Sequence, residues 1–292
     1  MFYNQNPKVA ALYILISGLM FAFMGACIKY ISDDVSTELI VFFRNLFAFL
    51  IMLPFAIKTG LKSLSTNVFG WHLVRSFAGV GAMYCFFYSI AYIPLSESVL
   101  LSYTTPLFAP VIAYFLLKER VSQRFIFAII LGFMGVSILL NPDFESFSWV
   151  SLIALCAGML AAIAMTSIRK LSKTEPAILV VFYFGLISTI VSALLLFLSF
   201  TDNEKLPTLK HFFVLLAIGL FAALGQFCLT RGYSMAKVAQ VGPYVYSTVV
   251  FATLIGWVYW HEVPTVYTGL GIILVIIAGV FALRTLSDEQ KY

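Results

Sequence analysis

The chain has 292 residues, of which 62% are hydrophobic and 11% charged, and its mean hydropathy is +1.00. A soluble domain is about half apolar and about one quarter charged, so a water-soluble fold of this chain would expose much apolar surface. The composition therefore excludes a soluble enzyme, a disordered chain and a nucleic-acid-binding domain. The net charge of +5 reflects 18 Lys and Arg residues, whose positions indicate membrane orientation.

Long apolar runs follow one another along the chain. A transmembrane helix needs about 20 consecutive apolar residues, and runs of this kind predict ten such helices. The runs are continuous rather than alternating, which excludes transmembrane strands. The connections between them are too short for a soluble domain. The expected spans are 9–29, 38–57, 70–92, 97–117, 125–140, 149–168, 177–199, 211–231, 239–260 and 266–283.

The basic residues predict the orientation of these spans. If the N-terminus is cytoplasmic, only Lys29, Lys205 and Lys210 fall on the external side, while Arg44 and Arg75 lie inside spans. The positive-inside rule then places both termini in the cytoplasm, and we expect a multi-pass protein of a bacterial inner membrane. The first span has no cleavage site and is expected to be retained. The four cysteines fall in different spans and indicate neither a disulfide framework nor a zinc site.

The two halves of the sequence resemble each other. An offset of 140 positions matches Gly18 with Gly158, and an offset of 143 matches Tyr103 with Tyr246. Other matched pairs are Ala22 and Ala162, Lys29 and Arg169, Thr105 and Thr248, and Glu119 and Glu262. Each half holds five expected helices, an odd number, so the second half enters the membrane from the opposite side. We predict two inverted repeats, 1–143 and 144–292, around a central cavity, a construction typical of secondary transporters.

A local motif adds a family resemblance. The stretch Ser102-Tyr-Thr-Thr-Pro-Leu-Phe-Ala-Pro is followed by Leu116-Leu-Lys-Glu-Arg and then by Leu131-Gly-Phe-Met-Gly-Val. This pattern resembles the EamA branch of the drug/metabolite transporter superfamily, with one copy in each half. The resemblance implies ten helices, a central cavity and transport of small metabolites, often amino acids or related compounds. Small proton-coupled exporters of the superfamily carry a glutamate inside the first helix, which 21–28 lacks.

Polar side chains at helical spacing mark the expected cavity wall. Ser98, Ser102 and Thr105 share one face of the fourth span, and similar stripes follow the third, eighth and ninth spans. An amide such as Gln226 needs hydrogen-bond partners in hydrocarbon. The candidate substrate-binding residues are Arg44, Tyr84, Tyr88, Ser98, Ser102, Thr105, Gln226, Thr230, Gln240, Tyr244 and Ser247. The same stripes are also compatible with a dry polar seam between helices.

Charged side chains near or within the spans are the second set of candidates. Arg44 lies inside the second span, where it either faces the bundle interior or extends to the headgroups. Arg75 lies nearer the cytoplasmic end of its span, so either position is open to it. Lys29, Arg75, Glu97 and Arg169 are candidate gating or mouth charges, with interfacial anchoring as the alternative for Lys29 and Arg169. We expect Arg44 to matter more for transport than Arg75.

The sequence therefore predicts a secondary transporter of small polar or zwitterionic metabolites that works by alternating access. An organic-anion carrier is the alternative within transport, and a membrane-embedded enzyme is the alternative of another class. No ATP-binding motif is present, and no His or carboxylate lies at mid-depth to serve as a catalytic base. We expect no cofactor and no nucleic-acid partner. The expected partners are a small-molecule substrate and the lipid bilayer, and the protein is expected to be a monomer or a homodimer.

Overall fold

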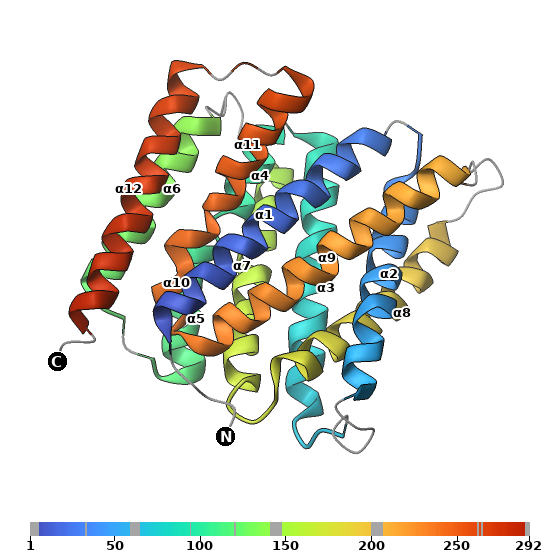
Figure 1. The fold of residues 1–292 in the computed structure, drawn as a ribbon, viewed down its shortest axis with the longest axis horizontal. Coiled ribbons are helices and arrows are strands. Elements are labelled where there is room, and N and C mark those ends of the chain that lie inside the picture. Colours follow the sequence, from blue (N-terminus) through green and yellow to red (C-terminus); the bar gives the residue numbers. More distant parts are fainter. Residues whose placement is uncertain are drawn as a thin grey trace.

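The computed structural model describes residues 6–32, 34–58, 65–93, 95–119, 121–140, 148–199, 207–261, 263 and 265–289, apart from the side chains at 90, 91, 95–97, 283 and 286–289. Within these residues the regular structure is entirely helical (Figure 1). The helices are α1 (Pro7–Ile31), α2 (Thr37–Lys58), α3 (Phe69–Tyr92), α4 (Leu95–Ser102), α5 (Thr105–Leu117), α6 (Gln123–Leu140), α7 (Trp149–Leu171), α8 (Ala177–Ser199), α9 (Leu209–Met235), α10 (Val238–Val245), α11 (Ser247–Trp260) and α12 (Val266–Glu289).

The apolar helices make the chain a multi-pass membrane protein. Eight stretches of the described chain are long and apolar enough to cross a bilayer. They are Pro7–Ile31, Thr37–Lys58, Ser98–Leu117, Gln123–Leu140, Trp149–Leu171, Ala177–Ser199, Leu209–Met235 and Val238–Trp260. The apolar part of α12, Val266–Ala282, is shorter, and α3 is not among the eight. The number of ten spans therefore stays a prediction.

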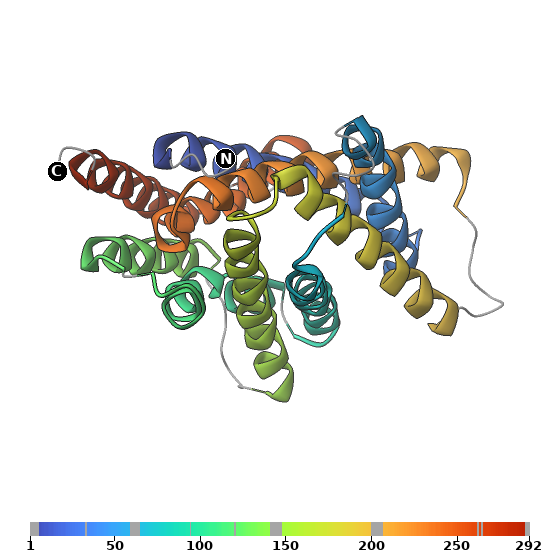
Figure 2. The same ribbon diagram turned by 90° about the horizontal axis from the view of Figure 1, so that it is seen from below.

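The main helix contacts join the first half of the chain to the second. The largest packing partners are α1 with α9, α3 with α7, α6 with α12, and α2 with α8. Figure 2 shows α3 to α7 on one side of the bundle and α1 with α9 to α12 on the other, while α2 and α8 lie together at one end. The two halves are thus interleaved rather than placed side by side as separate domains.

Small residues let these helices approach closely. A Cβ atom added to Gly225 of α9 would lie 2.7 Å from the Phe21 ring, and one added to Gly232 would lie 2.6 Å from Ile14. Both contacts are with α1, so a larger residue at either glycine would push α1 and α9 apart. Close approach at small residues is the usual way in which helices associate in membranes, where the hydrophobic effect does not drive association.

Two of the predicted spans are interrupted, which corrects the expectation of continuous helices over 97–117 and 239–260. The first is broken between α4 and α5, and the second between α10 and α11 at Tyr246. Pro106 lacks the N–H that would donate to the carbonyl of Ser102 in a continuous helix. The Thr105 hydroxyl donates to that carbonyl instead, at 2.9 Å. At the second break the Ser247 hydroxyl donates to the carbonyl of Tyr244 at 2.7 Å.

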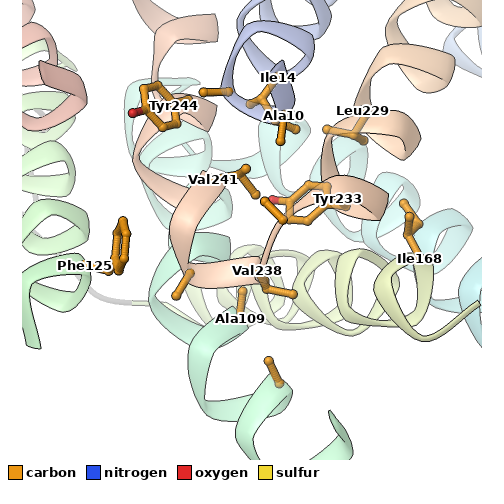
Figure 3. Packing of buried hydrophobic residues seen from close by; sticks show 14 of the residues in the cluster. Ala10, Ile14, Ala109, Phe125, Ile168, Leu229, Tyr233, Val238, Val241 and Tyr244 are labelled. Atoms are coloured by element: carbon orange, nitrogen blue, oxygen red, sulfur yellow. The ribbon is translucent and has the colours of Figure 1, made fainter. Parts of the chain in front are cut away.

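A hydrophobic cluster holds several of these helices together (Figure 3). Figure 3 shows side chains from α1, α5, α6, α7, α9 and α10 converging near the end of α9. The largest fully buried members include Tyr233 on α9, Phe125 on α6 and Ile168 on α7. Because the cluster contains residues of both halves, it closes the bundle at the end where α1 begins and α9 ends.

Candidate functional site

A cavity of about 230 Å³ lies where the two helix breaks meet. Its wall combines the α4–α5 break, the α10–α11 break, the middle of α1, the later part of α3 and α7, and the last two turns of α9. The lining residues are Ile14, Ser17, Gly18, Phe21, Phe86, Ser102, Tyr103, Thr105, Ala161, Met165, Leu229, Tyr233, Val245 and Thr248. Both halves of the chain therefore contribute to one space.

The cavity has apolar walls with a few hydroxyl groups. Ser17 donates to the carbonyl of Gly225 at 2.9 Å, and Tyr103 from the first break is hydrogen-bonded to Thr248 beside the second. The Ser102 hydroxyl is buried and has no hydrogen-bond partner among the described residues. No group of three His, Cys, Asp or Glu side chains in the described chain could hold a metal ion. The lining suits a small molecule with apolar surface and a few hydrogen-bonding groups.

The two matched glycines position the helix breaks. A Cβ atom on Gly18 of α1 would lie 2.9 Å from the hydroxyls of both Ser247 and Thr248. On α7, Gly158 faces the first break in the same way, against the Thr104 hydroxyl and the carbonyl of Leu101. Neither glycine could carry a side chain without moving the break that it faces. Each break is thus held against a helix of the other half.

Two of the predicted substrate-binding residues, Ser102 and Thr105, line this cavity. Ser98 instead contacts the Ser89 hydroxyl of α3, as in a polar seam between helices. Gln240 accepts a hydrogen bond from the Lys237 backbone at 3.0 Å, which caps the start of α10. Ser247 caps the second break, and the buried Thr230 hydroxyl has no hydrogen-bond partner within the described chain.

The predicted tyrosines do not share the cavity. Tyr88 is 48% exposed and its ring lies 4.7 Å from that of Tyr92. Tyr244 is buried with its ring 3.8 Å from a Cβ atom placed on Gly279 of α12, and Tyr84 has a buried hydroxyl without a described partner. Gln226, Tyr88, Ser102 and Tyr244 were expected to line one space. That expectation is wrong for Tyr88 and for Tyr244. The prediction for Tyr244 assumed that the ninth span is one continuous helix, whereas the helix is broken at Tyr246.

Arg75 lies inside the bundle and does not extend to the headgroups. Its side chain is 2% exposed. Its Nη2 donates to Gln226 Oε1 of α9 at 2.9 Å, and its guanidinium carbon lies 3.9 Å above the Phe184 ring of α8. Of the two positions that the sequence allowed for Arg75, the structure adopts the interior one. Gln226 thus contacts a cation and is not among the residues that line the cavity with Ser102.

Arg44 is also interior. It is 8% exposed, and its Nη1 donates to Asn45 Oδ1 at 2.7 Å. Asn45 in turn donates to the Ser192 hydroxyl of α8 at 3.3 Å. Arg44 and Arg75 therefore both lie beside α8, which Asn45 contacts at Ser192 and Arg75 contacts at Phe184. The alternative of an interfacial position for Arg44 is therefore excluded.

The remaining charged candidates have different surroundings. Lys29 is exposed at the end of α1, with its Nζ 4.8 Å from the centre of the Trp260 ring. Arg169 is fully buried, with its Nε 3.0 Å from Glu119 Oε1 and its Nη1 donating to the Ser234 carbonyl at 3.0 Å. Arg169 is therefore a neutralised tie between the halves and not an interfacial anchor. The side chain of Glu97 lies outside the described part.

Glu119 pairs with a residue that lies far away along the chain. Glu119 bonds to Arg169, a residue 50 positions away in the other half. Sequence neighbours on a helix end are easy to recognise, whereas a partner brought in by the fold is not.

Several cavity residues were missed from the sequence, among them Ser17, Phe86, Tyr233 and Thr248. For Thr248 a signal existed, because it matches Thr105 in the repeat alignment. The apolar members carried no signal that separates a cavity wall from lipid contact. A second hollow of about 370 Å³ between α2 and α8 is lined, in the described chain, by the apolar side chains of Phe42, Ala193, Leu196 and Phe197.

Comparison with known proteins agrees with this architecture. The profile of the EamA-like transporter family matches the chain twice, over residues 8–141 and 148–284. A pseudopaline exporter of Pseudomonas aeruginosa is 30% identical over 279 residues, covering 95% of this chain and 97% of that protein. A riboflavin transporter of Vibrio cholerae is 27% identical, covering 95% and 94% of the two chains. An S-adenosylmethionine uptake transporter of Rickettsia bellii is 27% identical, covering 87% and 86%.

A solved crystal structure with 17% sequence identity superposes with a TM-score of 0.84, covering 98% of this chain and 99% of that one. At this identity the likeness concerns the fold alone. The relatives are named as transporters of small molecules, and the double profile match extends over nearly the whole chain. The chain belongs to the EamA-like transporter family and is a membrane transporter rather than an enzyme.

Proposed function

We propose that the protein is a secondary transporter that moves a small polar or zwitterionic metabolite, such as an amino acid or a derivative, by alternating access. The observation that carries this proposal is the cavity at the meeting point of two broken helices. Interrupted helices at corresponding positions of two repeats are typical of substrate sites in secondary transporters. A volume of about 230 Å³ lies below the roughly 300–1,000 Å³ of common drug-sized sites, which favours a small solute.

The packing supports ten spans arranged as two inverted repeats, 1–143 and 144–292. The contact of α1 with α9 has a counterpart in that of α7 with α3, and the contact of α1 with α11 has one in that of α7 with α4 and α5. The two short helices α5 and α11 each end on a left-handed residue, Lys118 and His261, both with φ of 57°. The largest helix contacts thus have counterparts when the halves are exchanged, which supports two related repeats.

The proposed orientation has both termini in the cytoplasm of a bacterial inner membrane. Support comes from the distribution of Lys and Arg and from the position of α1 and α12, since α1 begins and α12 ends at the same side of the bundle (Figure 1). In this orientation the hydrophobic cluster of Figure 3 closes the cytoplasmic side.

An organic-anion carrier is the second candidate, favoured by the two buried arginines Arg44 and Arg75. The substrates named for the relatives, pseudopaline, riboflavin and S-adenosylmethionine, set a first panel of solutes to be tried. The direction of transport differs among the relatives' names, which include an exporter and an uptake transporter.

The test is transport by purified protein in proteoliposomes. Radiolabelled amino acids, dicarboxylates, riboflavin and S-adenosylmethionine would be screened by counterflow, without ATP. We expect at least one solute to be exchanged, and we expect Thr248→Trp, which fills the cavity, to abolish that exchange. Gly25→Leu is the control, because a Cβ atom at Gly25 meets no atom within 4 Å. Exchange that survives Thr248→Trp, or that requires ATP, would contradict the proposal.

A further inference from the structure

Two guanidinium groups lie buried in the bundle, those of Arg44 and Arg75. In the bonds found among the described residues, each donates only to a neutral amide oxygen, Arg44 to Asn45 at 2.7 Å and Arg75 to Gln226 at 2.9 Å. Neither arginine forms an ion pair with an Asp or Glu of the described chain. A buried ion without an opposite charge costs several kcal/mol. Such a charge in a membrane helix marks a functional site by default.

The two groups also act against each other. Arg44 on α2 and Arg75 on α3 both lie against α8, because Asn45, the partner of Arg44, donates to the Ser188 carbonyl at 3.5 Å and Arg75 lies over the Phe184 ring one turn earlier. Two positive charges beside the same stretch of a helix repel each other, which destabilises the empty protein. A structural tie would place opposite charges together, as Arg169 and Glu119 do at 3.0 Å. Two like charges held together without a counter-ion are expected where a ligand supplies the missing negative charge.

Unused hydrogen-bonding atoms surround this pair. The Nε of Arg75 and both ring nitrogens of His72 are buried without a partner in the described part of the chain. His72 lies one turn before Arg75 on α3, so both side chains project from the same face of that helix. The His72 ring lies 4.3 Å from that of Tyr183, which fixes its position. Buried polar groups normally have partners, and this many orphaned atoms in one place calls for a bound group.

Arg75 lies next to the cavity through its partner Gln226. Gln226, the partner of Arg75, precedes Leu229 and Tyr233 of the cavity wall by one and two turns on the same face of α9. A solute in the cavity thus has the guanidinium of Arg75 within about one helical turn of its wall. Phe184 covers the other face of that guanidinium and leaves the edge with its N–H donors for binding.

We propose that Arg44 and Arg75 bind an oxyanion group of the transported solute, a carboxylate or a phosphate. The planar fork of a guanidinium donates two parallel hydrogen bonds to either group. On binding, the donors now held by Asn45 and Gln226 become shared with the oxyanion, and its negative charge removes the repulsion between the two arginines. This inference rests on the proposed transport function and specifies which part of the solute is recognised.

The test is the thermal stability of the purified protein in sodium malonate, in sodium phosphate and in sodium chloride of equal ionic strength. A ligand that binds only the folded state raises the Tm. We expect malonate, phosphate or both to raise the Tm by roughly 2–4 °C or more above chloride. A rise with malonate alone assigns a carboxylate, and a rise with phosphate alone assigns a phosphate.

Variants decide whether the rise comes from this pair. Arg44→Gln and Arg75→Gln should each lose it, whereas Arg284→Gln, which removes the same charge at an exposed position of α12, should keep it. A rise that persists in both buried variants, or no rise in the unmodified protein, would overturn the proposal. If Gln prevents folding at either position, Lys is used there instead. A rise in Tm that is undiminished with Lys refutes binding through two parallel hydrogen bonds of the guanidinium.

Transport in proteoliposomes separates this inference from the proposed function. A protein that exchanges solutes but is not stabilised by either oxyanion is a transporter without this subsite. A protein that is stabilised through both arginines but exchanges no solute retains the subsite and refutes the transport proposal.

Discussion

Removal of either partner of the buried ion pair between the halves should destabilise the protein strongly. Arg169 and Glu119 have side chains 1% and 12% exposed, and their atoms lie 3.0 Å apart. Breaking a buried pair by removing one partner costs about 3–5 kcal/mol, because the other charge remains buried alone. Since Glu119 retains some exposure, we expect about 3 kcal/mol for Glu119→Gln, roughly a hundredfold change in the unfolding equilibrium.

The assay is chemical unfolding in detergent followed by tryptophan fluorescence. Arg169→Met should cost as much or more, since it also removes the donor to the Ser234 carbonyl. The double variant Glu119→Gln/Arg169→Met should cost clearly less than the sum of the single variants, because no unpaired charge remains. Arg284→Gln serves as the control and should change stability by less than about 0.5 kcal/mol. Additive costs, or single variants within that range, would refute the pairing argument.

Three further predictions follow from particular contacts. Gly158→Leu should lower the unfolding free energy by about 1–3 kcal/mol and reduce transport, because its side chain meets the first helix break, whereas Gly25→Leu should be nearly neutral in the same assays. Arg44→Lys and Arg75→Lys should both lower transport while the Tm stays near that of the unmodified protein, and unchanged transport in Arg44→Ala would show that this arginine has no role in recognition. A cysteine at Glu145 in a cysteine-free protein should react with an impermeant maleimide from outside, and labelling only from inside would reverse the orientation.

The sequence predicted the helices well because apolar runs of transmembrane length have few alternative structures. It also matched Gly18 with Gly158, the two glycines that face the helix breaks. It did not predict the breaks at Tyr103 and Tyr246. Hydropathy continues without interruption through both, and only the backbone shows where the hydrogen bonding changes.

The candidate site was predicted only in part for the same physical reason. Ser102 and Thr105 lie at a break and face the cavity, but Tyr244, expected on the same kind of stripe, precedes its break and faces α12. The position of Arg75 depends on whether its long side chain turns inward or outward, and the sequence does not determine this. Its partner Gln226 comes from the other half of the chain, 151 residues away.

For two polar residues the prediction from the sequence agrees with the structure. Arg44 and Gln226 were singled out because a charge or an amide inside a membrane helix needs a partner, and both have one in the structure. The revised expectation is that Arg75 matters as much as Arg44, because it has the lower exposure and contacts both α8 and α9.

The central claim, one cavity open to each side of the membrane in turn, is tested most directly by labelling Ser102→Cys in a cysteine-free protein. Ser102 lines the cavity, and Ser148→Cys at the start of α7 reports the sidedness of each vesicle preparation. An impermeant maleimide should label position 102 from outside and also from inside. Glu119→Gln should increase the rate of labelling from the cytoplasmic side, because it weakens the ion pair with Arg169 that joins the halves. Labelling from one side alone, unchanged in Glu119→Gln, would contradict alternating access through this cavity.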